Sequence, residues 1–305
     1  MKFSLSKYIW FDGKFVPVNM AKVPVTTHAI HYGTSIFEGI RAYWNSKNLH
    51  VFRLKDHIKR FRNSGKFYNI TLNFSDKQIE NAVIDLCKKN KIKKSCYIRP
   101  FYFVGQYGIN FYVTKNAPTH TAIFAFPFGD LFNKSGITVT VSKWRKFSDM
   151  STPTQAKMGG NYLNSILATQ DAKQKGFDEA VLLDQSGNVS EAPGENIFLV
   201  KNDGVITPSL SSSALDGITR RSIITLAKDF NLKIRERKVS KKELKLADEI
   251  FLSGTAAEIT PIIKIDKKKI GGGEVGNVTK LFMDTYSDIV MNKNKTHSKW
   301  LTTVY

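Results

Sequence analysis

Residues 121–141 read TAIFAFPFGDLFNKSGITVTV, and this stretch joins two strand patterns through a turn-rich connection. Both ends are rich in branched and aromatic residues, which favour strands. The middle, residues 127–136, contains Pro, two Gly, Asp, Asn and Ser, which are typical of an exposed loop between domains. We therefore expect a small domain at 1–126, an interdomain loop at 127–136 and a larger domain at 137–305.

The first domain is expected to combine a sheet with two helices. Asp12-Gly13 lies between two β-prone runs and predicts a hairpin, because both residues can adopt positive φ. One helix is expected at about 54–68, with Ile58, Phe61 and Phe67 on its apolar side, and a second at 76–89. With strands at 95–104 and 121–126, this pattern predicts an α+β sandwich domain.

The second domain shows many short strands and three helices. Helices are expected at about 160–175, 218–231 and 277–291, and strands at 137–141, 179–183, 188–191, 196–200, 205–207, 233–237 and 249–253. This mixture predicts a closed or partly closed β-barrel with helical covers. The fold class is therefore a two-domain α+β protein.

The chain of 305 residues is basic, with 46 Lys plus Arg against 26 Asp plus Glu and a net charge of +20. Such a charge raises the expectation of nucleic-acid binding. However, the lysine runs at 88–94, 235–245, 264–269 and 293–299 lack aromatic platforms and zinc spacing. A solvated lysine-rich surface is the favoured interpretation, with no nucleic-acid partner.

The remaining composition indicates a soluble folded protein. Hydrophobic residues make up 42% of the chain, which excludes disorder, and no apolar run is long enough to span a membrane. Cys87 and Cys96 show no metal-ligand spacing and no disulfide framework, and Lys7 interrupts any secretory apolar segment. We expect a cytoplasmic protein without a metal site.

Three polar groups in the second half could carry chemistry. In the first, Lys157 precedes the pair Gly159-Gly160. A lysine beside closely packed backbone can be desolvated, which lowers its pKa and makes the neutral amine a nucleophile toward carbonyls. The alternative is an ordinary surface cation, since lysines are frequent in this chain.

The other two groups combine acids, hydroxyls and glycines. Residues 188–198 place Glu191, Glu195 and Asn196 between strands, where buried acids need partners. A hydrophilic turn is an equally open interpretation for Glu195 and Asn196. Residues 211–220 and 253–261 place a Gly and hydroxyls where a helix or turn begins, so their backbone N–H groups can bind an anion such as phosphate.

These segments resemble the branched-chain amino acid aminotransferases, which are pyridoxal-phosphate enzymes of fold type IV. The similarity runs from Tyr8 to about Lys280, and its most specific segments are His31–Arg41 (HYGTSIFEGIR), Tyr97–Pro100 (YIRP), Lys157–Tyr162 (KMGGNY), Ser190–Phe198 and Ser253–Pro261. The resemblance implies a smaller α+β domain, a larger pseudo-barrel domain and an active site between them.

The resemblance also assigns the cofactor, pyridoxal 5'-phosphate, to particular residues. Lys157 would be the catalytic Schiff-base lysine and proton carrier, Glu191 would pair with the pyridine nitrogen and Tyr162 would bond to the phenolic oxygen. The phosphate would be bound by Arg60, the N–H groups of Ile218 and Thr219 and the hydroxyl of Thr255, and Leu215 and Gly217 would also contact the cofactor. For Arg60, a solvent-facing cation like its neighbours is the alternative from the residues alone.

For the substrate, the resemblance implies a largely apolar pocket. Its residues would be Tyr32, Phe37, Gly39, Tyr97, Arg99, Thr255 and Ala256, with the α-carboxylate on Tyr97 and the N–H groups of Thr255 and Ala256. Arg99 would receive the second carboxylate of glutamate. An amphipathic strand with a surface Arg is the alternative for Tyr97 and Arg99, and Pro100 predicts a strand edge or end.

Some positions depart from the family pattern. They are Phe128 and Leu131 in the connection, Pro193 after Glu191, and the aromatic segment 106–114. None of them is a residue assigned to the lysine, glutamate or phosphate positions. They therefore affect the expected preference among leucine, isoleucine, valine and aromatic substrates, and not the expected chemistry.

The implied activity is reversible transfer of the amino group of L-leucine, L-isoleucine or L-valine to 2-oxoglutarate, giving branched 2-oxo acids and L-glutamate. The implied assembly is a homodimer, or a higher oligomer of dimers, in which a partner subunit supplies Tyr32. D-amino acid aminotransferase and aminodeoxychorismate lyase share the lysine and the glutamate and are the alternatives of the same fold. A basic nucleic-acid-binding protein is the alternative from another class.

Overall fold

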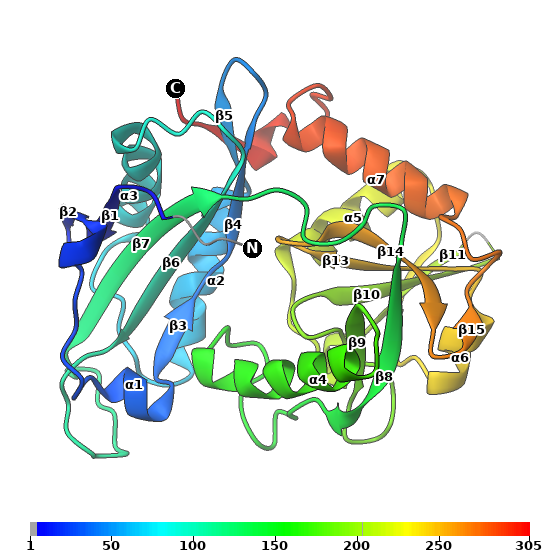
Figure 1. The fold of residues 1–305 in the computed structure, drawn as a ribbon, viewed down its shortest axis with the longest axis horizontal. Helices are drawn as coiled ribbons and strands as arrows, with labels where there is room; N and C mark the ends of the chain where they lie inside the picture. Colours follow the sequence, from blue (N-terminus) through cyan, green and yellow to red (C-terminus); the bar gives the residue numbers. More distant parts are fainter. Residues whose placement is uncertain (1–4, 203) are drawn as a thin grey trace. The chain divides into compact units, whose positions relative to one another are not determined.

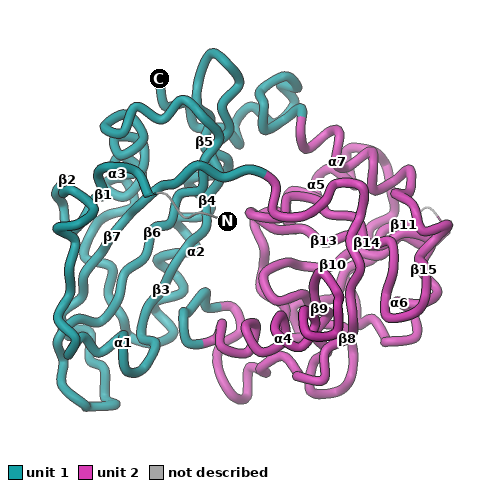
Figure 2. Tube along the Cα trace, viewed as in Figure 1, with its two compact units in different colours: residues 1–129, 156–160, 288–305 teal, residues 130–155, 161–287 magenta. Residues whose placement is uncertain are grey.

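The computed structural model describes residues 5–202 and 204–305 and divides into two compact units. Unit 1 consists of residues 1–129, 156–160 and 288–305, and unit 2 of residues 130–155 and 161–287 (Figure 2). Each unit contains one eight-stranded sheet with helices beside it, so the predicted two-domain α+β fold is confirmed. In the described part of the chain, no helix is both long enough and apolar enough to cross a membrane.

Unit 1 is an antiparallel sheet in the order β16-β5-β4-β6-β7-β1-β2, with β3 paired to β6 (Figure 1). Its strands are β1 (Tyr8–Phe11), β2 (Lys14–Pro17), β3 (Ser35–Phe37), β4 (Ile40–Trp44), β5 (Leu49–Phe52), β6 (Cys96–Val104), β7 (Thr119–Pro127) and β16 (Leu301–Thr303). Its helices are α1 (His28–Tyr32), α2 (Leu54–Lys66) and α3 (Asp76–Lys89). The predicted hairpin joins β1 to β2, with Asp12 and Gly13 both at positive φ.

The core of unit 1 lies between the sheet and helices α2 and α3. Ile58 and Phe61 of α2 are buried in one cluster with Ile98 and Tyr102, which share a face of β6 because strand side chains alternate. Phe67 was expected on the same apolar side, and this prediction is wrong. The helix ends at Lys66, so Phe67 falls beyond its last turn and is 54% exposed.

Pro100 was predicted to mark a strand edge or end, and this too is wrong. It lies in the middle of β6, which pairs with β7 along its whole length on one side. On the other side β6 pairs with β3 up to Phe37 and with β4 from Ile40, so Glu38 and Gly39 interrupt the partner strand opposite the proline. Proline has no N–H that would need an acceptor there, and the carbonyl of Pro100 accepts from the N–H of Glu38 at 2.8 Å.

Unit 2 contains a sheet in the order β12-β11-β10-β13-β14-β8-β9, with β15 paired to β14. Its strands are β8 (Ile137–Arg145), β9 (Glu179–Leu183), β10 (Asn196–Lys201), β11 (Gly204–Pro208), β12 (Ile234–Arg237), β13 (Glu249–Gly254), β14 (Glu258–Ile265) and β15 (Lys268–Lys269). Its helices are α4 (Tyr162–Gln174), α5 (Ile218–Asp229), α6 (Lys241–Leu246) and α7 (Asn277–Val290), whose last turn is assigned to unit 1.

A short extended segment closes this second sheet. Residues 188–191 were expected to form a strand but form isolated bridges, Val189 to Leu183 of β9 and Asn188 to Ser240 just beyond β12. The N–H of Val189 also bonds to the carbonyl of Val239 at 2.8 Å. Because β9 and β12 are the two ends of the sheet, these contacts produce the predicted pseudo-barrel.

The units differ from the expected domain bounds in two places. Residues 156–160, which include Lys157, belong to unit 1 because their main chain bonds to residues of β3 and α2. The last residues also belong to unit 1, because β16 pairs with β5. With these segments, unit 1 is nearly as large as unit 2.

Gly65 in α2 provides a test of the unit 1 packing. A Cβ at this position would lie 1.9 Å from the hydroxyl of Tyr102 and 2.5 Å from the carbonyl oxygen of Ile70. We expect Gly65→Ala to lower the free energy of unfolding by about 1–3 kcal/mol, although alanine is the better helix former. Denaturant unfolding measures this change. Gly129→Ala is the control, because its Cβ would meet no described atom within 4 Å, and equal midpoints for the two variants would contradict the packing.

Candidate active site

The main chain of residues 157–160 is held against β3 in unit 1. The N–H of Phe37 bonds to the carbonyl of Lys157 at 3.2 Å, and the N–H of Gly160 bonds to the carbonyl of Gly33 at 3.2 Å. A Cβ on Gly33 would lie 3.0 Å from the Cα of Gly160, and one on Gly159 would lie 2.4 Å from the hydroxyl of Ser35. This close approach explains why glycines surround the lysine in the sequence.

The amine of Lys157 lies over the ring of Phe37, with its Nζ 4.7 Å from the ring centroid. The guanidinium of Arg99 lies 4.7 Å from the same centroid. Burial lowers the pKa of Lys157 to about 8, helped by Arg60 and opposed by Glu38 and Tyr97. A neutral nucleophilic amine is therefore accessible at a pH well below that of an ordinary lysine.

A buried carboxylate holds Arg60 in place. Glu38 is fully buried, and its oxygens accept from Nε and Nη2 of Arg60 at 2.6 and 2.9 Å. They also accept from Nδ1 of His57 at 2.8 Å and from the N–H of Gly39 at 3.2 Å. Burial alone would raise the pKa of Glu38, but Arg60 and His57 outweigh it and hold that pKa well below its usual range. Burial lowers the pKa of His57. Arg60 is thus anchored within the unit, which disfavours the solvent-facing alternative.

Four of the expected pocket residues gather near Lys157. Tyr97 and Arg99 share one face of β6, and Nη2 of Arg99 donates to the hydroxyl of Tyr97 at 3.2 Å. A Cβ on Gly39 would lie 1.7 Å from that hydroxyl, so only glycine fits there. With Phe37, these residues combine aromatic surface with one cation, which disfavours an ordinary surface strand.

Tyr32 is placed differently from the other expected pocket residues. It ends α1, is 36% exposed, and its ring contacts His28 at 4.6 Å and Phe111 at 5.1 Å between centroids. In this chain it is a surface aromatic residue.

In unit 2, Glu191 is buried at the centre of a set of donors. Its Oε1 lies 2.6 Å from Nζ of Lys146. Its Oε2 accepts from Nδ2 of Asn196 at 3.1 Å and from the N–H of Leu215 at 3.0 Å. Burial lowers the pKa of Lys146, but Glu191 outweighs burial and the net pKa of Lys146 is raised. The site therefore holds a preorganised carboxylate with a charged partner.

The loop before α5 belongs to the same hydrogen-bonded group. Asn196 also donates to the carbonyl of Leu215 at 2.8 Å, and a Cβ on Gly217 would lie 2.0 Å from Oδ1 of Asn196. The amide of Gln155 donates to the carbonyl of Ala214 at 2.7 Å and accepts from the N–H of Asp216 at 3.1 Å. These bonds fix the start of the helix.

Helix α5 begins at Ile218, with Thr219 next, and its N-cap residue Gly217 forms no side-chain cap. The N–H groups of a first helical turn make an anion-binding site.

Thr255 and Ala256 lie in the turn between β13 and β14. Near this turn, Ser253 pairs with Asn196 across the strands, and its buried Oγ has no partner among the described residues. Tyr162 begins α4 and contributes to raising the pKa of Lys146, which places it beside that lysine.

Several polar residues of the site escaped the sequence interpretation. Glu38 lies inside the segment 31–41, but nothing in the pattern distinguishes it as the anchor of Arg60. Lys146 resembles any other lysine of this basic chain, and Gln155 resembles any other loop amide. Their roles come from contacts with residues far away in the sequence, 45 positions in the case of Lys146 and Glu191.

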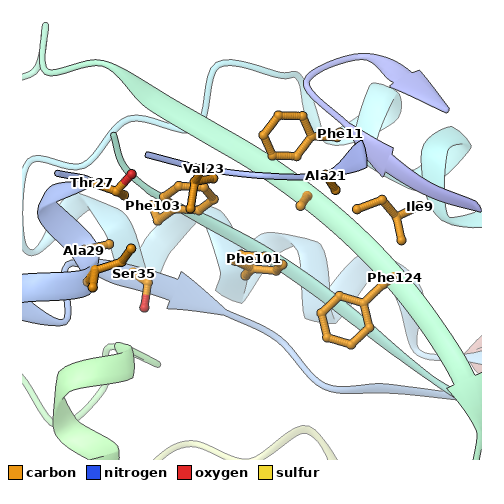
Figure 3. Close-up of a pocket in the computed structure, with 12 residues that line it drawn as sticks. Ile9, Phe11, Ala21, Val23, Thr27, Ala29, Ser35, Phe101, Phe103 and Phe124 are labelled. Carbon is orange, nitrogen blue, oxygen red and sulfur yellow. The ribbon is translucent and has the colours of Figure 1, made fainter. Parts of the chain in front are cut away.

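Unit 1 also contains an apolar cavity of about 340 Å³. Figure 3 shows Phe101, Phe103 and Phe124 lining it, from β6 and β7. Apart from Thr27 and Ser35 its lining is apolar, so this cavity offers no group for acid–base chemistry.

Comparison with known proteins identifies close relatives. The family "Amino-transferase class IV" matches residues 35–265. The chain is 41% identical to a probable branched-chain-amino-acid aminotransferase of Aquifex aeolicus over 98% of this chain and 97% of that protein. It is 42% identical to the branched-chain-amino-acid aminotransferase of Escherichia coli K12, over 97% of both.

Solved structures agree with this similarity. The branched-chain aminotransferase of Thermoproteus uzoniensis with norvaline has a TM-score of 0.95 and 39% identity, covering 98% of this chain and 100% of that one. The branched-chain amino acid aminotransferase of Thermobaculum terrenum in its PLP form has a TM-score of 0.93 and 33% identity, covering 99% of both chains.

The low pKa of Lys157 predicts its labelling behaviour. An amine reacts only when neutral, so acylation of Lys157 should rise with pH and reach half its limit near pH 8. Arg60→Met should move that midpoint to higher pH, because it removes a neighbouring positive charge and leaves Glu38 unneutralised. Mass spectrometry of the labelled peptide follows the reaction, with exposed lysines in the same digest as the reference. A midpoint near the ordinary value of 10.5 would contradict the site geometry.

Proposed function

The chain belongs to the class IV aminotransferases, and from this premise we propose that it transfers the amino group of L-leucine, L-isoleucine or L-valine reversibly to 2-oxoglutarate. The products are branched 2-oxo acids and L-glutamate. The observation that carries the proposal is Lys157, a partly buried lysine with a pKa of about 8 beside an aromatic ring and an arginine.

The cofactor is pyridoxal 5'-phosphate, as in the related structures. When bound, it supplies an electron sink for the negative charge that develops at the substrate Cα. The donor set fits this group: a neutralisable amine at Lys157, an anchored carboxylate at Glu191 and a helix N-terminus at α5.

We assign the cofactor contacts by chemical type. Lys157 would hold the cofactor at its aldehyde carbon, Glu191 would accept a hydrogen bond from the pyridine N–H, and Tyr162 would donate one to the phenolic oxygen. The phosphate is assigned to Arg60, the N–H groups of Ile218 and Thr219 and the hydroxyl of Thr255, and Leu215 and Gly217 are assigned to the remaining cofactor contacts. The anchoring of Arg60 by Glu38 supports its assignment, because an oriented guanidinium loses less entropy on binding an anion.

Lys157 also carries the proton in this proposal. The neutral amine of Lys157 would remove the proton from the substrate Cα and would deliver it to C4′ of the bound cofactor. A base with a pKa of about 8 suits both directions, because general acid–base catalysis is most efficient near the working pH.

The proposed substrate contacts account for the dual specificity. Phe37 and Gly39 provide apolar and open surface for a branched side chain, and Tyr97 binds the α-carboxylate together with the N–H groups of Thr255 and Ala256. Arg99 lies over the rings of Phe37 and Tyr97 at 4.7 and 5.2 Å, so it remains available for the side-chain carboxylate of glutamate.

The assay that tests this function compares amino donors. Purified enzyme with pyridoxal phosphate should convert L-leucine and 2-oxoglutarate to L-glutamate, and should show no comparable activity with D-alanine or aminodeoxychorismate. Lys157→Ala should lose the visible band of the bound cofactor and at least about 10³-fold in kcat, since it removes both nucleophile and base. Retained turnover in this variant, or a preference for D-alanine, would refute the assignment.

Arg99→Leu gives a separate test of the pocket in the same assay. We expect the KM for 2-oxoglutarate to rise about 10- to 100-fold, because a charge-assisted hydrogen bond is lost, while the KM for L-leucine changes less. The exposed arginine of β12, changed as Arg235→Leu, is the matched control. Equal changes for both substrates would remove Arg99 from the second-carboxylate site.

We also propose that the protein forms a homodimer, or an oligomer built from dimers. The support is a group of exposed apolar residues in unit 1, namely Val25, Ile30, Ile109, Phe111 and Tyr112, together with the apolar cavity of the same unit. Exposed apolar surface of this kind is typical of protein–protein contacts. In the dimer Tyr32 would join the partner's pocket. Light scattering should give at least twice the mass of 34.5 kDa, whereas a monomer at working concentrations would overturn this assembly.

A further inference from the structure

Lys146 and Glu191 are brought together by neighbouring residues of one strand. The N–H of Lys146 bonds to the carbonyl of Leu183 at 2.8 Å, and the N–H of Leu182 bonds to the carbonyl of Glu191 at 2.8 Å. Both backbones are therefore fixed to the end of β9, and their side chains meet at 2.6 Å. The pair is built into the sheet rather than formed by two mobile surface chains.

The carboxylate of Glu191 needs this cation. Its side chain is 6% exposed and that of Lys146 is 15% exposed, so water neutralises little of the charge. The other two donors in the described contacts, the amide of Asn196 and the N–H of Leu215, are neutral. Tyr162 is the further titratable group that acts on Lys146. A buried carboxylate that loses its cation is strongly destabilised unless it takes up a proton.

We propose that Lys146 is a positioning residue that keeps Glu191 anionic and oriented, so that Glu191 accepts a hydrogen bond from the cofactor's ring nitrogen without removing its proton. This inference rests on the proposed function. It assigns Lys146 a role that acts through Glu191 and not on the cofactor itself.

The proposed role of Lys146 follows because two positively charged groups, its own ammonium and the protonated ring nitrogen, would share the carboxylate of Glu191. A buried carboxylate without a cation would draw the proton from the ring nitrogen, which weakens the electron sink. With Nζ of Lys146 at 2.6 Å, the charge of Glu191 is neutralised by a cation and the proton stays on the ring. Because the pKa of Lys146 is raised, the lysine remains charged over the working pH range.

The test separates the charge of Lys146 from its hydrogen bond. Lys146→Arg keeps both, Lys146→Gln keeps a donor without the charge, and Lys146→Met keeps neither. Lys143→Met is the matched control, because Lys143 is 66% exposed and pairs with Asp171 at 3.6 Å. Circular dichroism and the thermal midpoint show whether each variant folds. If Lys146→Met does not fold, the charge is tested by comparing Lys146→Gln with Lys146→Arg.

The first measurement uses the protein without cofactor. Infrared difference spectra at pH 7, with the Glu191→Gln spectrum subtracted, should show protonated carboxyl at position 191 in the Gln and Met variants and carboxylate in the wild type, the Arg variant and the control. Carboxylate in all of them would overturn the proposal. The infrared measurement does not depend on the reaction, so it tests the effect of Lys146 on Glu191 even if the proposed function is wrong.

The second measurement uses the holoenzyme. We expect kcat for L-leucine to fall about 10- to 100-fold in both the Gln and Met variants. Residues that orient a metal ligand through a hydrogen bond have effects of this size when they are replaced. The Arg variant should recover most of the activity. Normal kcat in Lys146→Gln would show that the hydrogen bond suffices and would also overturn the role of the charge.

Discussion

The main-chain contact between residues 157–160 and strand β3 is the constraint on which the candidate site in unit 1 depends. Two hydrogen bonds and the bridge from Met158 to Ile36 hold the backbone so closely that Gly33 and Gly159 leave no room for a Cβ. With its backbone fixed, the Lys157 side chain must extend over Phe37. Burial there lowers its pKa, so the contact that places the amine also makes its neutral form accessible, as the proposed function requires.

Glu38 in unit 1 and Glu191 in unit 2 are both buried carboxylates, and they are neutralised in different ways. Glu38 is held by a bidentate arginine and a histidine, so it acts as the anchor of a phosphate-binding cation in the proposed function. Glu191 is held by one lysine and two neutral donors, and in the proposed function its carboxylate also accepts a hydrogen bond from the cofactor's ring nitrogen. The number and geometry of the charged donors therefore distinguish a buried acid that anchors another side chain from one that can accept a hydrogen bond from a cofactor.

Much of the fold could be predicted from local patterns. The helices expected at about 54–68 and 76–89, the Asp12-Gly13 hairpin and most barrel strands follow from periodicity and turn chemistry, and the structure confirms them, with the first helix ending at Lys66. The errors occur where a neighbouring segment decides the outcome. Phe67 is exposed because α2 ends one residue earlier. Pro100 is tolerated inside β6 because the chain opposite it is interrupted at Glu38 and Gly39.

The sequence by itself indicated the family and the cofactor type through its resemblance to known proteins, and that resemblance assigned the candidate lysine and glutamate, because the matching segments are short and continuous in the chain. Only the tertiary structure decided that Glu38 holds Arg60, that Lys146 holds Glu191 and that Gln155 fixes the loop before α5. The physical reason is that hydrogen bonds and ion pairs act over a few ångströms in space, whereas these partners are separated by 22, 45 and 59 residues along the chain.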